Sequence, residues 1–238
     1  MAQVINTNVT ALFAASALNR SAQALQTAQQ RLSSGLRINS VKDDATGLVT
    51  ATTYDASIRG TNVAIRNAND AISSGQTNDG YAAQIVENLQ RLHEIFVQTN
   101  DAGNSESAAL ITENGRIAKL TSAAPTNVTV DGSGGTVNGT GTAITAPTGS
   151  TAAAVLTDIT TVTANRAAYG ADIATFSSAV ATMQSAAVNL SAAYSRVMDT
   201  DYAVESMNAT RNNILQQAGT AALAQANQNP ALVLSLLK

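Results

Sequence analysis

The chain has 238 residues, a formal net charge of −3, 12% charged residues and no Cys. This weakly acidic composition lacks the basic surface of nucleic-acid-binding proteins, and the absence of Cys excludes disulfides and thiolate metal sites. Hydrophobic residues make up 45%, but many are Ala and only 3% of the chain is aromatic, which favours long helix–helix contacts over a compact core of large side chains.

Neither a transmembrane helix nor a cleavable signal peptide is predicted. No apolar run approaches the ~20 residues that cross a bilayer. The first 21 residues carry no basic segment at their start, and Asn and Thr interrupt their apolar residues. We therefore expect no membrane insertion, and any export should use a route that does not read such a signal.

The first half of the chain predicts three helices. Leu18, Leu25 and Leu32 recur at seven-residue intervals, and Ser33 to Gly35 end that helix before a polar connector over 37–44. The second helix carries Ala51, Ile58, Ile65 and Ile72 at the same interval, is weakened at 73–75, and continues through an apolar stripe over 82–96. A polar segment at 100–104 should end it, and a shorter helix is expected over 106–120.

The middle of the chain, 125–150, combines Gly with short Thr/Val alternations. This pattern favours a small β-hairpin with an exposed turn at Asp131-Gly132, or else a disordered loop.

The second half predicts a long helix from Ala152 to Val197 with a coiled-coil seam. The seam alternates steps of three and four through Ile173, Phe176, Val180, Met183, Ala187, Leu190, Tyr194 and Val197. Residues 198–201 break this register, and a new phase is expected to run through Val204, Met207, Ile214, Ala218 and Ala221. Pro230 stands where a helix would be kinked or restarted.

These elements predict a mainly all-α fold, an extended antiparallel helical coiled-coil bundle in two layers with a small central β-hairpin or loop. The ends, 1–42 and 203–238, should pair as an inner terminal-helix layer. Residues 43–125 and 151–202 should form a second helical layer, with 126–150 as a short variable hairpin or loop at the outer surface. A helix pair so poor in large residues should need neighbouring copies to become ordered.

The sequence offers little catalytic chemistry. His93 is the single histidine, so no H-E-x-x-H zinc site can form within the chain, and a surface position is expected for it. Asp43 and Asp44 are better explained as helix-capping or salt-bridging residues than as a catalytic pair. We therefore predict no enzyme activity, no cofactor and no metal.

Several longer motifs resemble bacterial flagellin. They are QRLSSGLRINS (30–40), KDDATG (42–47), RNAND (66–70), LQR (89–91), ILQQAGT (214–220), LAQANQ (223–228) and VLSLL (233–237). The resemblance covers roughly 1–120 and 155–238. It differs from many flagellins in its middle, where about 30 residues replace large outer domains.

The resemblance implies a structural subunit that self-assembles into the flagellar filament for motility, and is secreted unfolded through the flagellar export apparatus. The terminal and adjoining layers would be the family's D0 and D1 layers. Expected partners are identical subunits, an export chaperone, and cap and hook-junction proteins. The residues expected to carry assembly are Leu18, Leu25, Leu32, Ile214, Ala218, Leu223, Leu232, Leu234 and Leu237. The alternative is a flagellin-like hook–filament junction protein, whereas an enzyme inserted in such a scaffold would need a longer middle.

The resemblance also implies recognition by Toll-like receptor 5. The matching positions are Leu89, Gln90, Arg91, Glu94, Ile95 and Gln98. His93, Phe96 and Gly115 depart from the family's pattern, which favours reduced affinity. The alternative is that Leu89, Leu92 and Phe96 face the bundle while Arg91 and Gln98 contact a neighbouring subunit.

Overall fold

A computed structural model describes residues 7–99, 104–123, 128–129 and 134–235, with side chains as far as 228. In this part of the chain, the helices are α1 (Val9–Ser34), α2 (Ala45–Thr99), α3 (Ser105–Ala118), α4 (Ala152–Met198) and α5 (Tyr202–Ser235). The strands β1 (Val128–Thr129) and β2 (Thr136–Val137) form one small antiparallel sheet. The predicted mainly α-helical fold is confirmed.

The chain forms two compact units. The first joins 1–52 with 193–238, and the second contains 53–192, so the boundary falls within α2 and within α4. The layer boundaries predicted at 42 and 203 concern an assembly of many copies and stay predictions.

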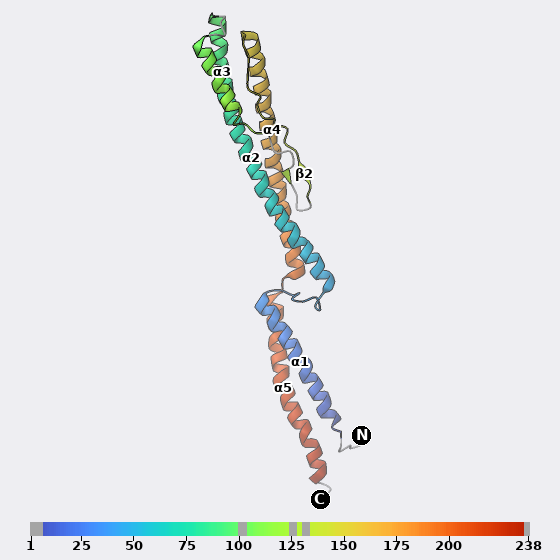
Figure 1. The fold of residues 1–238 in the computed structure, drawn as a ribbon. Coiled ribbons are helices and arrows are strands. Elements are labelled where there is room, and N and C mark those ends of the chain that lie inside the picture. The colour runs from blue at the N-terminus through green and yellow to red at the C-terminus, as the bar shows by residue number, and fades with distance from the viewer. Residues whose placement is uncertain (1–6, 100–103, 124–127, 130–133, 236–238) are drawn as a thin grey trace. The chain divides into compact units, whose positions relative to one another are not determined.

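The first unit contains the antiparallel pair of α1 and α5, which lie side by side in Figure 1. Asn8 caps the start of α1, where its side chain accepts a hydrogen bond from the Ala11 N–H at 3.1 Å. Gly35 ends the helix in the left-handed conformation, with φ of 73°, and its N–H donates to the Arg31 carbonyl at 2.8 Å. This is the glycine-specific C-cap geometry that the sequence predicted.

The connector after α1 is anchored to the chain between α4 and α5. The Arg37 N–H donates to the Met198 carbonyl at 2.6 Å, and the Thr200 N–H donates to the Gly35 carbonyl at 2.9 Å. Ile38, Ala51 and Met198 form a small core beneath these bonds. The connector is therefore a fixed part of the first unit.

Of the two adjacent aspartates in the connector, one caps a helix as predicted and the other binds backbone N–H groups within the connector. Asp44 caps α2 by accepting from the Gly47 N–H at 2.8 Å. Asp43 accepts from the N–H groups of Asn39 and Ser40 at 3.1 and 2.9 Å. The hydrogen bond from Asn39, followed by that from the Ser40 hydroxyl, lowers the pKa of Asp43 below its ordinary value.

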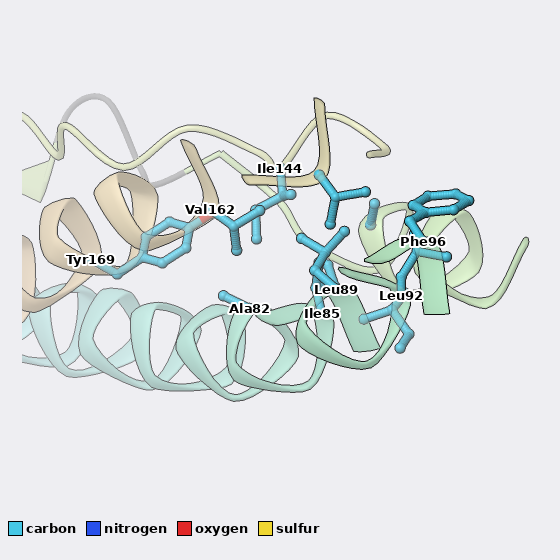
Figure 2. Packing of buried hydrophobic residues seen from close by; sticks show 11 residues of the cluster. Ala82, Ile85, Leu89, Leu92, Phe96, Ile144, Val162 and Tyr169 are labelled. Atoms are coloured by element: carbon cyan, nitrogen blue, oxygen red, sulfur yellow. The ribbon is translucent and has the colours of Figure 1, made fainter. Parts of the chain in front are cut away.

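The second unit has a core of large side chains. Ile85, Leu89 and Leu92 of α2 belong to one buried cluster with Val162 and Tyr169 of α4. In Figure 2 the Tyr169 ring lies next to Ala82, and Leu92 lies farther along α2 near Phe96. Phe96, Ile117 of α3 and Ile144 extend the same cluster. A second cluster contains Ala64, Ala68, Ala71, Val128, Phe176 and Met183.

The predicted seam on α4 is confirmed. Phe176 and Met183 are buried and the other six seam positions are half-buried, whereas the residues between the seam positions are mostly exposed. The helix is 47 residues long and continues without a break through the seam.

The central segment contains the predicted hairpin, with Val128 opposite Val137 and Thr129 opposite Thr136. The expected turn at Asp131-Gly132 lies outside the described residues. Beyond β2 the chain is bound to α4 through Asp172 of that helix. The Asp172 carboxylate accepts hydrogen bonds from the Thr140 N–H, the Thr140 hydroxyl and the Gly141 N–H, each at 2.8 Å. The segment is thus pinned to the second unit by a buried carboxylate.

Helical backbone continues at both places where the sequence predicted a weakened or kinked helix. α2 is continuous through 73–75, where Gly75 packs on Ile173 and a side chain would be crowded: an added Cβ would lie 3.1 Å from the Ile173 side chain. The backbone of α5 remains helical through Pro230 to Ser235.

Candidate functional site

The face of α5 that packs on α1 is a seam of small and polar residues. Every position along it is buried or half-buried, and the steps alternate four and three as in a coiled coil. We call this the inner seam: Glu205, Ala209, Asn212, Gln216, Gly219, Leu223 and Ala226. The side chain of Leu18 fits against Gly219, where an added Cβ would lie 3.2 Å from the Leu18 Cδ1 atom. Close approach at Gly219 therefore replaces the large-residue packing of an ordinary seam.

Polar contacts fix the register of the α1–α5 pair. The Tyr202 hydroxyl donates to the Leu32 carbonyl at 2.9 Å. The Arg31 guanidinium lies 3.7 Å from the Glu205 carboxylate, which is buried. At the other end, the Asn8 amide donates to the Ala226 carbonyl at 2.8 Å. Directional contacts therefore hold both ends of a pair whose inner seam has few large apolar residues.

The opposite face of α5 is exposed and, apart from Arg211, apolar. We call it the outer seam: Val204, Met207, Arg211, Ile214, Ala218 and Ala221, all exposed and spaced by alternating steps of three and four. Met207 and Ile214 keep 61% and 60% of their surface accessible. At 100° per residue the two seams lie roughly on opposite sides of the helix. The phase predicted through Val204, Met207, Ile214, Ala218 and Ala221 is this exposed face, whereas the small and polar inner-seam residues occupy the interface with α1.

α1 also carries exposed apolar side chains near its start. Val9, Leu12 and Phe13 keep 67%, 63% and 71% of their surface accessible. Single exposed apolar residues are normal on a protein surface, but repeated ones on two paired helices indicate a surface meant to be covered.

The residues predicted to carry assembly fall into three groups. Leu18, Leu25 and Leu32 on α1 and Leu223 on α5 are half-buried within the helix pair, whereas Ile214 and Ala218 lie on the outer seam. Leu232 and Leu234 belong to the helical backbone of α5 but their side chains, like Leu237, lie outside what the structure describes.

Other kinds of site find no support among the described residues. Within the described ranges, no three His, Cys, Asp or Glu side chains gather as a metal site would require. Likewise, no described helix is long and apolar enough to cross a membrane. His93 is half-buried on α2 rather than fully on the surface.

Comparisons with known proteins agree with this two-ended architecture. Residues 5–133 match the family described as the bacterial flagellin N-terminal helical region, and residues 152–237 match the bacterial flagellin C-terminal helical region. The flagellin of Xenorhabdus nematophila is 38% identical over an alignment of 313 positions that covers all of both chains. The chain belongs to the bacterial flagellin family.

Other flagellins match one part of this family member more strongly. Flagellins of Salmonella rubislaw and Salmonella typhimurium are 53% identical over 107 residues, which is 45% of this chain. The aligned part is 22% of each Salmonella protein, so the chain spans about a fifth of the length of these flagellins.

The flagellin positions linked above to receptor recognition divide by burial. Gln90, Arg91, Glu94 and Gln98 are exposed on α2, whereas Leu89 and Ile95 are 0% and 3% exposed and belong to the core. Arg91 donates to the carboxylates of Glu94 and Glu106 at 3.1 and 3.0 Å. These bonds, chiefly that to Glu106, raise the pKa of the Arg91 guanidinium above its ordinary value. Gln90, Arg91, Glu94 and Gln98 thus form one exposed row, which we call the charged row, and two carboxylates hold the Arg91 side chain in place.

Sequence reasoning missed the inner seam and the Asp172 contact. The inner seam has coiled-coil spacing, but its polar and small residues gave no hydrophobic signal. Asp172 lies within an apolar helix directly before the seam position Ile173. Its partners Thr140 and Gly141 are about 30 residues away in the sequence, so no local pattern joins them.

Proposed function

We propose that this flagellin-family chain is a structural subunit that self-assembles into an extracellular flagellar filament, through helices at its two ends. The observation that carries the proposal is that α5 has an outer seam in addition to the inner seam. One seam is occupied by α1 within the same chain, and the outer seam is apolar, regular and uncovered in the single chain.

Identical subunits are the partner that fits this surface best. A helix with two heptad seams on opposite sides packs between two neighbours, and an open series of such contacts builds a filament. Full burial of an Ile or Met side chain contributes about 1.5–3 kcal/mol. The exposed outer-seam residues of many copies would therefore stabilise a polymer, although one pair of chains would bind weakly.

A truncation and a matched pair of variants test the proposal. Removing 203–238 should leave a soluble chain that forms no filaments in electron microscopy. In the full chain, Met207→Glu combined with Ile214→Glu should abolish filaments because two carboxylates would have to be buried between copies. Asn213→Glu adds one such carboxylate at an exposed position of the same helix that lies outside the outer seam. It should still assemble.

The helical content of each monomer, measured by circular dichroism, separates failed assembly from failed folding. Filaments from the truncated chain, or from the double variant with unchanged helical content, would contradict the proposal.

We further propose that Toll-like receptor 5 contacts the charged row of Gln90, Arg91, Glu94 and Gln98. Leu89 and Ile95 are buried, so they would not touch the receptor and would instead hold α2 in position through their packing in the core. Weak binding is expected because His93, Phe96 and Gly115 differ from the family pattern. The alternative is that Arg91 and Gln98 contact a neighbouring subunit.

A receptor-signalling titration tests this second proposal. Arg91→Ala should raise the concentration needed for a half-maximal response, since it removes the side chain that joins Glu94 and Glu106. Arg59→Ala is the matched control, because Arg59 is an exposed arginine on the same helix paired with Asp55. Equal responses from both variants would exclude the row as the receptor contact, and a loss of filaments in Arg91→Ala alone would favour the subunit contact.

The proposal includes an export chaperone, a cap and hook-junction proteins as transient partners. The alternative role, a hook–filament junction protein, predicts few copies per flagellum. Counting subunits in sheared flagella separates the two roles, because a filament subunit should be the most abundant protein there.

A further inference from the structure

We propose that Asn138-Gly139 is a site of spontaneous deamidation, at which the folded chain converts Asn138 to aspartate and isoaspartate. The chain contains two Asn-Gly pairs, Asn114-Gly115 and Asn138-Gly139. Glycine after asparagine is the most permissive arrangement for this chemistry because it has no side chain to hinder the attacking backbone nitrogen. The structure places the two pairs in opposite environments.

Asn138 has the access and the backbone freedom that the reaction needs. It is exposed and follows the end of β2 in irregular backbone, before Thr140 is fixed by Asp172. The nitrogen of Gly139 attacks the side-chain carbonyl carbon of Asn138, and ammonia leaves as a five-membered succinimide forms. Water then opens either carbonyl of that ring, giving aspartate or isoaspartate. The reaction needs only water and a base to remove the backbone proton.

Asn114 lacks that freedom. It is fully buried within α3, and its Oδ1 accepts a hydrogen bond from the Asn88 amide at 2.8 Å. Helical backbone holds the following nitrogen away from the side-chain carbonyl carbon. Reaction at Asn114 therefore requires local opening of α3.

Conversion at Asn138 changes the segment that Asp172 anchors. It adds one negative charge to a chain of net charge −3. Isoaspartate also inserts a methylene group into the backbone two residues before Thr140, whose N–H and hydroxyl bind Asp172. We expect deamidated chains to hold the 138–144 segment less firmly.

The test incubates the full-length chain in mildly alkaline buffer and follows tryptic peptides 92–116 and 120–166 by mass spectrometry, with fragmentation to locate the change. In the folded chain Asn138 should convert at least about tenfold faster than Asn114, because α3 must open first. In concentrated urea the two sites should convert at similar rates.

Two variants complete the test. Asn138→Gln should remove the fast conversion, because glutamine forms the larger ring much more slowly. Gly139→Ala should slow it by hindering the attack. Comparable rates at Asn114 and Asn138 in the folded chain, or retention of the Asn138 amide in folded protein while it is lost in urea, would overturn the proposal.

Discussion

The α1–α5 pair and the core of the second unit are both built from long helices at heptad spacing, but they are stabilised differently. The second unit buries large side chains, including Tyr169, Phe176 and Leu89, at 1% exposure or less. Along the α1–α5 pair, the buried residues are Ala28, Glu205 and Ala226, at 1%, 7% and 8% exposure, and none of them is a large apolar side chain. Apart from Leu223, the larger apolar side chains that the structure describes on α5, such as Ile214 and Met207, remain exposed.

This difference shows that one helical pattern serves two purposes. The second unit buries its largest apolar side chains within the chain, so its stability should depend less on neighbouring copies. The terminal pair keeps apolar side chains on its surface and holds itself together through close approach at Gly219 and a few polar contacts. Its stability should depend on what covers the outer seam.

The largest expected difference between the two regions is in the free energy of unfolding when one large side chain is replaced by alanine. Phe176→Ala should lower the free energy of unfolding by about 3–5 kcal/mol because it leaves a cavity in the second unit. Met207→Ala on the outer seam should change the stability of the monomer by less than about 0.5 kcal/mol. Urea unfolding followed by circular dichroism measures both. Equal losses would mean that the two regions are packed alike.

A second prediction concerns the buried carboxylate of the second unit. Asp172→Asn places an NH₂ group among the N–H donors of Thr140 and Gly141. Each lost hydrogen bond to the charged group contributes about 1.5–3 kcal/mol, and the unfolding free energy should fall by about that amount. Faster amide exchange at Thr140 and Gly141 should accompany the loss.

Asp158→Asn is the matched control for that substitution. Asp158 accepts one hydrogen bond, from the Gly149 N–H at 3.0 Å, which an asparagine oxygen can still accept. Its effect should be less than about 1 kcal/mol. If the two variants were equally stable, Asp172 would not be the anchor of the central segment.

The terminal pair should be sensitive to bulk in its interface. Gly219→Leu would force the new side chain into Leu18, and overpacking of this kind costs about 1–3 kcal/mol. Hydrogen exchange in α1 should become faster. Ala222→Leu changes an exposed residue of the same helix to the same side chain and should leave exchange in α1 unchanged. Unaltered protection in Gly219→Leu would show that the pair does not depend on close approach.

The smallest expected effect is an alkaline loss of stability in the second unit. Burial, and then the nearby charge of Asp172, raise the pKa of Tyr169 above its ordinary value of 10.0. The unfolded chain therefore releases this proton first, so stability is complete below about pH 10 and falls as the pH rises through the folded pKa.

Tyr169→Phe should abolish this dependence on pH. It should also lower the plateau by about 1 kcal/mol, because the hydroxyl donates to the Thr142 carbonyl. Thermal unfolding across the alkaline range measures both changes. A Phe variant with the same alkaline slope as the parent would assign the effect to other groups.

The sequence by itself determined most of the helical architecture. The seven-residue spacing of Leu18, Leu25 and Leu32 and the unbroken seam from Ile173 to Val197 required helices with one buried side. Gly35 marked the end of α1 because few other residues adopt its left-handed conformation. Asp44 marked the start of α2 as a cap. These are local rules, so they can be read from neighbouring residues.

The tertiary structure decided which face of α5 meets α1 and where the central segment lies. The inner and outer seams of α5 both have heptad spacing. Hydrophobicity alone would select the outer seam, with Met207 and Ile214, as the face to be buried, and not the inner seam, with Gly219 and Glu205. The choice depends on the fit of Leu18 against Gly219 and on the approach of Arg31 to Glu205, both of which join opposite ends of the chain. Asp172 likewise acts on residues that folding alone brings close. Spacing along a chain specifies periodicity, but shape and charge across an interface specify the partner.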